Sequence, residues 1–130
     1  MVMKKEIENW LSSARYDLTV AKDMLDAGRY PYVVFFCHLA VEKALKARVQ
    51  EITGKTPPKV HDLVALLKLA QLTPPPEFLD FIGKLSGAST AIRYPTDLAE
   101  LLSTYTREAA EEYLRQAKDV VEWIAKRLNL

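Results

Sequence analysis

The sequence predicts an all-α protein, an up-and-down bundle of three long helices and two shorter ones. Apolar residues recur at intervals of three or four along most of the chain, which is the period of an amphipathic helix. No segment alternates apolar and polar residues as a half-buried strand does, and there is no Asn-Gly hairpin turn. Glycine and proline are few, 4 and 7 in 130 residues, and they fall where helices would begin or end.

The first two helices are predicted over residues 4–27 and 31–52. Each is followed by a glycine, Gly28 or Gly54, which can adopt the left-handed conformation that closes a helix. Pro31 is tolerated in a first helical turn, where its missing N–H would have no partner. The expected buried faces are Ile7, Trp10, Leu11, Ala14, Leu18, Ala21 and Leu25 in the first helix, and Val34, Cys37, Leu39, Ala40, Val41, Ala44, Leu45 and Val49 in the second.

The rest of the chain predicts three more helices. A short helix is expected over residues 62–72, with Leu63, Leu66, Leu67 and Leu69 toward the core. The next begins after the prolines at 74–76 and ends near Arg93, because the residue before Pro95 is disfavoured in a helix. Its small-sided stretch, residues 86–91, would let a neighbouring helix approach closely. Residues 96–104 are expected to be irregular or to form one short turn, and the last helix spans residues 106–128, with Ala109, Tyr113, Ala117, Val120, Ile124 and Leu128 buried.

Size and composition narrow the class of protein. A chain of 130 residues favours a single domain over residues 1–130, and 49% hydrophobic with 27% charged residues is a globular balance. A formal net charge of +1 argues against a protein built mainly to coat nucleic acid. The single cysteine, Cys37, excludes an intrachain disulfide and a multi-cysteine metal site, so a reduced, cytoplasmic compartment is expected. No stretch has the length of uncharged apolar sequence that a membrane span needs.

One polar stripe interrupts the apolar second helix. His38, Glu42 and Lys46 are spaced by four and share one helical face, with Lys43 beside them. This stripe is either a solvated face with an ion pair or a polar groove that positions a phosphate or a partner carboxylate. Asp17, in the first helix, would need a cationic partner if buried, and Lys43 or Arg93 could provide it.

Two further groups carry chemistry. Arg93 and Tyr94 end a helix before Pro95, where they either complete that helix end or offer forked donors and a stacking ring to a ligand. His61 and Asp62 precede a helix and more readily cap it than catalyse. The chain has no glycine-rich phosphate loop, no GxSxG elbow and no HExxH motif, so neither a metal nor a cofactor is expected. Cys37 and His38 are adjacent and point apart on a helix, which argues against a catalytic dyad.

Taken together, these segments resemble the HEPN family, the domain named for higher eukaryotes and prokaryotes nucleotide-binding. The resemblance covers nearly the whole chain in the same helix order. The matching segments are Trp10-Leu11 with Ala14-Arg15-Tyr16-Asp17-Leu18 and Ala21, Gly28-Arg29-Tyr30 with Phe36 and Ala40-Val41-Glu42-Lys43-Ala44-Leu45-Lys46-Ala47, Lys59-Val60-His61-Asp62-Leu63, and Ala91-Ile92-Arg93-Tyr94-Pro95.

The resemblance implies a helical bundle that dimerises and is often encoded beside a minimal nucleotidyltransferase. It also implies nucleotide binding in some members and metal-independent RNase activity in others, where an arginine is followed four to six residues later by histidine. This chain departs from that RNase pattern. No histidine follows Arg93, and neither Arg29 nor Arg48 has one at that distance.

Three hypotheses follow from these residues. The first is a non-catalytic module, of a toxin–antitoxin-like pair, that binds a nucleotide or a nucleotidyltransferase partner. Its ligand-binding residues are Asp17, Glu42, Lys43, Lys46, Arg93 and Tyr94. The second is an atypical metal-independent endoribonuclease toxin that acts as a dimer, with Arg93 and His61 as catalytic candidates. The third is a homodimeric interaction module whose polar residues form structural ion pairs. The absent histidine favours the hypotheses without catalysis.

Overall fold

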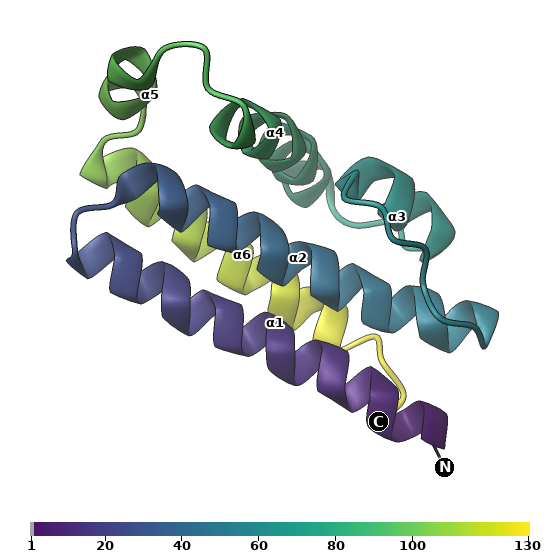
Figure 1. Ribbon diagram of the computed structural model, residues 1–130. Helices are drawn as coiled ribbons and strands as arrows, with labels where there is room; N and C mark the ends of the chain where they lie inside the picture. Colours follow the sequence, from purple (N-terminus) through teal and green to yellow (C-terminus); the bar gives the residue numbers. More distant parts are fainter. Residues whose placement is uncertain (1) are drawn as a thin grey trace.

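The computed structural model describes residues 2–130, and within them the chain is all-helical, as predicted. The helices are α1 (Val2–Asp26), α2 (Tyr30–Thr53), α3 (Leu63–Leu69), α4 (Pro76–Arg93), α5 (Leu98–Thr104) and α6 (Arg107–Ala125). The long helices α1, α2 and α6 lie side by side, and α3, α4 and α5 cover the remaining side of α2 (Figure 1). No helix in residues 2–130 combines the length and hydropathy needed to span a membrane.

Local chemistry sets three of the helix ends where the sequence predicted them. Gly28 and Gly54 have positive φ values of 76° and 70°, so each takes the left-handed conformation that a side chain would strain. Asp62 caps α3 by accepting hydrogen bonds from the backbone N–H groups of Val64 and Ala65. His61 and Asp62 therefore play different parts, because Asp62 is committed to the cap.

The helix α2 forms the centre of the bundle and has no solvated face along most of its length. Of its 24 residues, 14 are buried, and these include His38, Glu42 and Lys46 as well as the predicted apolar positions other than Leu39, which is half-buried. The interpretation of His38, Glu42 and Lys46 as a solvent-facing stripe is therefore wrong. These polar side chains are enclosed by α1, α4 and the segment before α3, so their charges have to be balanced inside the protein.

Several local expectations are corrected. The helix α3 ends at Leu69 rather than at residue 72, and Leu69 is exposed because it falls on the outer face of this short helix. The expected irregular segment contains α5, which Asp97 starts by accepting a hydrogen bond from the N–H of Glu100. The helix count is therefore one higher than predicted. The helix α6 ends at Ala125, and Leu128 is buried although it lies in the segment after this helix.

Within the small-sided stretch of α4, Ser89 is buried, whereas Gly87 faces open space. A Cβ atom added at Gly87 would meet no atom within 4 Å, and Gly87 is exposed. The small side chains leave space between α4 and its neighbours. That space forms part of the site described next.

Candidate functional site

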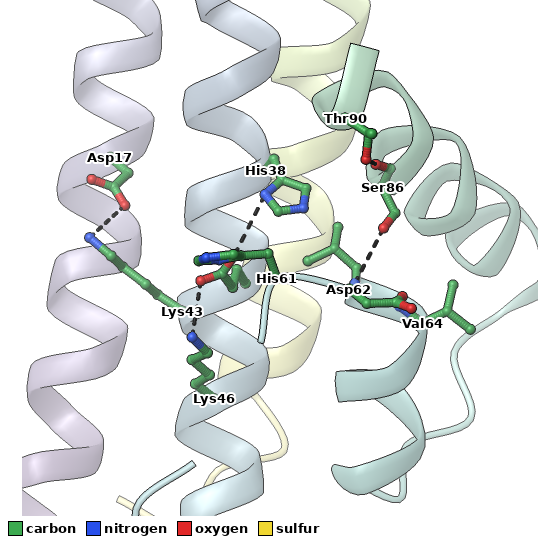
Figure 2. A network of polar contacts seen from close by, with 11 residues as sticks. Asp17, His38, Lys43, Lys46, His61, Asp62, Val64, Ser86 and Thr90 are labelled. Carbon is green, nitrogen blue, oxygen red and sulfur yellow. Dashed lines mark hydrogen bonds and ion pairs between the residues drawn. The ribbon is translucent and has the colours of Figure 1, made fainter. Parts of the chain in front are cut away.

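A cavity of about 290 Å³ lies between α2, the segment before α3, and α4. Figure 2 shows His38 and His61 on the side of α2 that faces Ser86 and Thr90 of α4. The polar lining combines two imidazoles, several hydroxyl groups, one carboxylate and one guanidinium. The lining residues are His38, His61, Asp62, Ser86, Gly87, Ser89, Thr90 and Arg93.

The carboxylate of Glu42 organises the polar residues beside this cavity. Glu42 Oε1 lies 3.0 Å from His61 Nδ1, and Glu42 Oε2 accepts a hydrogen bond of 3.0 Å from Lys46 Nζ. A carboxylate only accepts, so His61 donates through Nδ1 and its Nε2 is left for another partner. Because Glu42 and Lys46 are both buried, each supplies the opposite charge that the other requires.

His38 is a neutral residue in the wall of the cavity. Its exposed fraction is 1%. Burial lowers the pKa of the ring to about 4, the Glu42 carboxylate acts against this shift, and the Arg93 guanidinium adds to it. His38 Nδ1 is 3.7 Å from Glu42 Oε1, too far for a hydrogen bond. At neutral pH the ring therefore contributes hydrogen-bonding capacity but no charge.

Asp17 and Lys43 form a separate pair at the contact between α1 and α2. Lys43 Nζ lies 2.9 Å from Asp17 Oδ2 and donates a hydrogen bond of 2.8 Å to Ser13 Oγ. The pairing of Asp17 with Lys43, one of the two partners predicted for this carboxylate, is observed. Figure 2 shows this pair on the α1 side of α2, away from His61.

Arg93 and Tyr94 are adjacent in sequence but line different cavities. Arg93 ends α4, lines the cavity with the histidines, and places its guanidinium carbon 5.3 Å from the centre of the Phe35 ring. Tyr94 is 77% exposed and lines a neighbouring hollow of about 230 Å³. Among residues 2–130, Arg93 forms no ion pair with a carboxylate, so its charge is available to a ligand.

The predicted ligand-binding residues therefore do not form one cluster within the chain. Arg93 and His61 share a cavity, and Glu42 holds His61 and Lys46. Asp17 and Lys43 lie on the other side of α2, and Tyr94 lines its own hollow. His38 and Ser89 are cavity residues that the site prediction omitted. The i,i+4 spacing of His38 and Glu42 indicates that His38 lies on the same helical face as Glu42. Nothing in the sequence distinguishes Ser89 from the serine and threonine residues near it.

A more open groove of about 590 Å³ lies between the start of α1 and the end of α2. Trp10 Nε1 donates a 2.9 Å hydrogen bond to Gln50 Oε1, and Gln50 in turn donates to the Glu6 carboxylate. The charged residues that line this groove are Lys5, Glu6 and Glu8. Its buried polar groups bond to one another, so it offers less to an anionic ligand than the smaller cavity does.

The described part of the chain contains neither a candidate metal site nor a reactive thiol. Residues 2–130 contain no group of three or more histidine, cysteine, aspartate or glutamate side chains that could hold a metal ion. Cys37 is fully buried, and burial raises the pKa of its thiol to about 12. A thiol in that state is not a nucleophile at neutral pH, and its role is core packing.

Replacing Lys43 tests how much the pair with Asp17 stabilises the fold. We expect Lys43→Ala to lower the free energy of unfolding by about 1–2 kcal/mol, because it leaves a buried carboxylate without its cation. Lys22→Ala is the matched control, since Lys22 forms an exposed ion pair with Asp26 and should cost less than about 0.5 kcal/mol. Urea unfolding of both variants measures the difference, and equal losses would contradict the assignment.

The buried neutral His38 makes stability depend on pH. The folded ring has a pKa of about 4 and the unfolded ring one near 6.5, so the unfolded chain takes up the proton first as the pH falls. The stabilisation is therefore present above pH 6.5 and is lost as the pH falls toward 4. Between pH 7 and pH 5 the wild type should lose about 2 kcal/mol more than His38→Leu in urea unfolding. Parallel losses would show that this ring is not the titrating group.

Known proteins identify the fold. A family model described as the HEPN domain matches residues 7–128. The crystal structure of TT1696 from Thermus thermophilus is similar with a TM-score of 0.80 and 27% identity, over 94% of this chain and 98% of that one. The crystal structure of ST0689, an archaeal HEPN homologue, is similar with a TM-score of 0.75 and 25% identity, over 93% and 96% of the two chains. Curated proteins give no match. With the family model spanning all six helices in their order along the bundle, the chain belongs to the HEPN domain family.

Proposed function

We propose that this HEPN-domain protein binds a nucleotide, with the phosphate held by Arg93 in the cavity between α2 and α4. The observation that supports this most directly is the state of Arg93, a half-buried guanidinium in a polar cavity without a carboxylate partner in residues 2–130. A guanidinium offers forked donors that match phosphate oxygens, and His61 lies beside it with a free ring nitrogen.

The charge pairing refines which cations would contact the phosphate. Lys43 and Lys46, both expected from the sequence to do so, are held by Asp17 and Glu42. They would have to leave buried carboxylates to reach a ligand, which is costly. We therefore assign the phosphate contact to Arg93 and His61, and assign Lys43, Lys46, Asp17 and Glu42 to the support of the site.

The cavity accepts only part of a nucleotide. Its volume of about 290 Å³ lies at the lower end of the range for small-molecule sites and suits a phosphorylated sugar. A base would then lie outside the cavity mouth. The exposed ring of Tyr94, next to Arg93 in the chain, is the stacking surface available to it there.

Calorimetric titration with ATP and UTP tests the proposal. We expect Arg93→Ala to weaken binding about tenfold to a hundredfold, as loss of a charged hydrogen-bond donor does. Arg115→Ala is the control, because Arg115 is an exposed arginine of α6 paired with Glu112. An absence of heat at millimolar nucleotide with the wild type would refute nucleotide binding, and equal affinities in the two variants would refute the role of Arg93.

A second candidate function is metal-independent RNA cleavage. The observation that favours it is that His61, which is far from Arg93 in sequence, lines the same cavity. With Glu42 holding Nδ1, His61 could exchange a proton at Nε2, while Arg93 stabilised charge on the phosphate. We rank this function second, because the net charge of +1 provides little general attraction for RNA.

Incubation of mixed RNA with the protein in the presence of a chelator tests the second candidate. If the activity belongs to this site, cleavage by the wild type should fall at least about a hundredfold in both His61→Ala and Arg93→Ala. Cleavage that persists in both variants would assign the activity to another site or to a contaminant.

We also propose that the chain forms a homodimer, with a minimal nucleotidyltransferase as the alternative partner for the same face. Three apolar side chains are exposed together around a small hollow beside α5: Tyr32, Leu98 and Leu102. The helix α5 has no buried residue, so its own packing gives it little stability. Sedimentation of the isolated chain measures which partner is needed, since a monomer would favour a second protein.

A further inference from the structure

The polar side chains of the cavity can be sorted by whether they already have hydrogen-bond partners. Asp62 caps α3, Ser86 Oγ accepts a 3.3 Å hydrogen bond from the N–H of Leu63, and Thr90 Oγ1 donates to the carbonyl of Ser86. His61 is held by Glu42. Asp62, Ser86 and Thr90 are therefore already hydrogen-bonded within the protein, and His61 keeps only Nε2 free, for the phosphate proposed above.

Two buried side chains of the same cavity lack such partners. The hydroxyl of Ser89 has no hydrogen-bond partner within residues 2–130, and neither has Nδ1 of His38. Each residue is 1% exposed. A buried polar group without a partner costs stability and is uncommon in a native protein, so each such group calls for an explanation. His38 Nδ1 faces the Glu42 carboxylate at 3.7 Å, and both His38 and Ser89 line the cavity. The location of the Ser89 hydroxyl in the cavity wall indicates that its missing partner is a bound molecule.

The two unpartnered groups are neutral, which limits what they can bind. Ser89 carries a hydroxyl, and the lowered pKa of His38 leaves its ring uncharged at neutral pH. A second phosphate in this position would be buried without a counter-charge, which is unfavourable. A ligand hydroxyl fits better, because it donates and accepts hydrogen bonds as the serine hydroxyl and the neutral imidazole do.

We infer that Ser89 and His38 form a subsite for a ribose hydroxyl of the nucleotide whose phosphate is bound by Arg93. This inference rests on the proposed function and names the sugar that the site prefers. Ser89 and Arg93 are four residues apart on α4, so they lie on the same helical face one turn apart. The hydroxyl and the phosphate of one phosphorylated sugar are separated by a distance similar to one helical turn, about 5 Å. The volume of the cavity accommodates such a sugar.

The test compares adenosine monophosphate with its 2′-deoxy and 3′-deoxy analogues by calorimetric titration. We expect at least one analogue to bind the wild type about five- to tenfold more weakly than the ribonucleotide, the cost of losing one neutral hydrogen bond. Ser89→Ala should remove this preference and keep the affinity for the deoxy analogue. Thr90→Ala is the matched control and should retain the preference, because the Thr90 hydroxyl is already bonded to the carbonyl of Ser86.

Stability without ligand provides a second measurement. If the Ser89 hydroxyl has no partner in the free protein, Ser89→Ala should leave the melting temperature unchanged or raise it. A clear decrease would show that the hydroxyl has a structural partner and would overturn the inference.

The outcomes also separate this inference from the proposed function. If the ribonucleotide and both analogues bind the wild type equally, with weakening by Arg93→Ala, the phosphate site stands and the hydroxyl subsite is refuted. If neither these compounds nor ATP and UTP bind at all, both proposals fail together. A preference that survives Ser89→Ala would place the sugar contact elsewhere and would also refute the subsite.

Discussion

The buried carboxylate of Glu42 is the constraint around which the centre of this protein is arranged. It lies on the helix α2, which neighbours enclose on most of its length, so its charge cannot be solvated by water. Lys46 from the next turn and His61 from the segment before α3 contact its two oxygens. The contact with His61 ties that segment to α2, and it places an imidazole at the edge of the cavity beside α4.

The same enclosure of α2 separates two polar systems that lie close together in sequence. Residues 42 and 43 are adjacent, yet Glu42 faces His61 and Lys43 faces Asp17 of α1. Neighbours on a helix point in different directions, and here α1 contacts Lys43 whereas the segment before α3 contacts Glu42. The pair of Lys43 and Asp17 connects α2 to α1. The contact of Glu42 with His61 borders the cavity that contains Arg93, which has no carboxylate partner in residues 2–130. The proposed binding function therefore belongs to the side of α2 that faces α4.

The cavity itself arises from small side chains. Gly87 in α4 lines the cavity, and a Cβ atom added to it would meet no side chain or backbone within 4 Å. The fold therefore keeps an opening where Ser86, Ser89 and Thr90 present hydroxyl groups. Two of these hydroxyls are bonded within the protein, and the third is buried without a partner in residues 2–130. The opening thus has a cationic part at Arg93 and a neutral part at Ser89 and His38.

The sequence alone predicts the all-α class, the helix ends at Gly28 and Gly54, and most of the apolar core, because these depend on local periodicity and backbone conformation. It also limited the partner of Asp17 to two residues, of which Lys43 is the one observed. The exposure of Leu69 and the helix α5 are not predicted, because short segments contain too few residues for a periodic signal. The pairing of the ionisable groups, in contrast, depends on the tertiary structure. In the folded chain His38, Glu42 and Lys46 are buried, Lys43 and Lys46 are paired with carboxylates, and Arg93 has no carboxylate partner in residues 2–130. Burial and charge pairing depend on which segments meet in space.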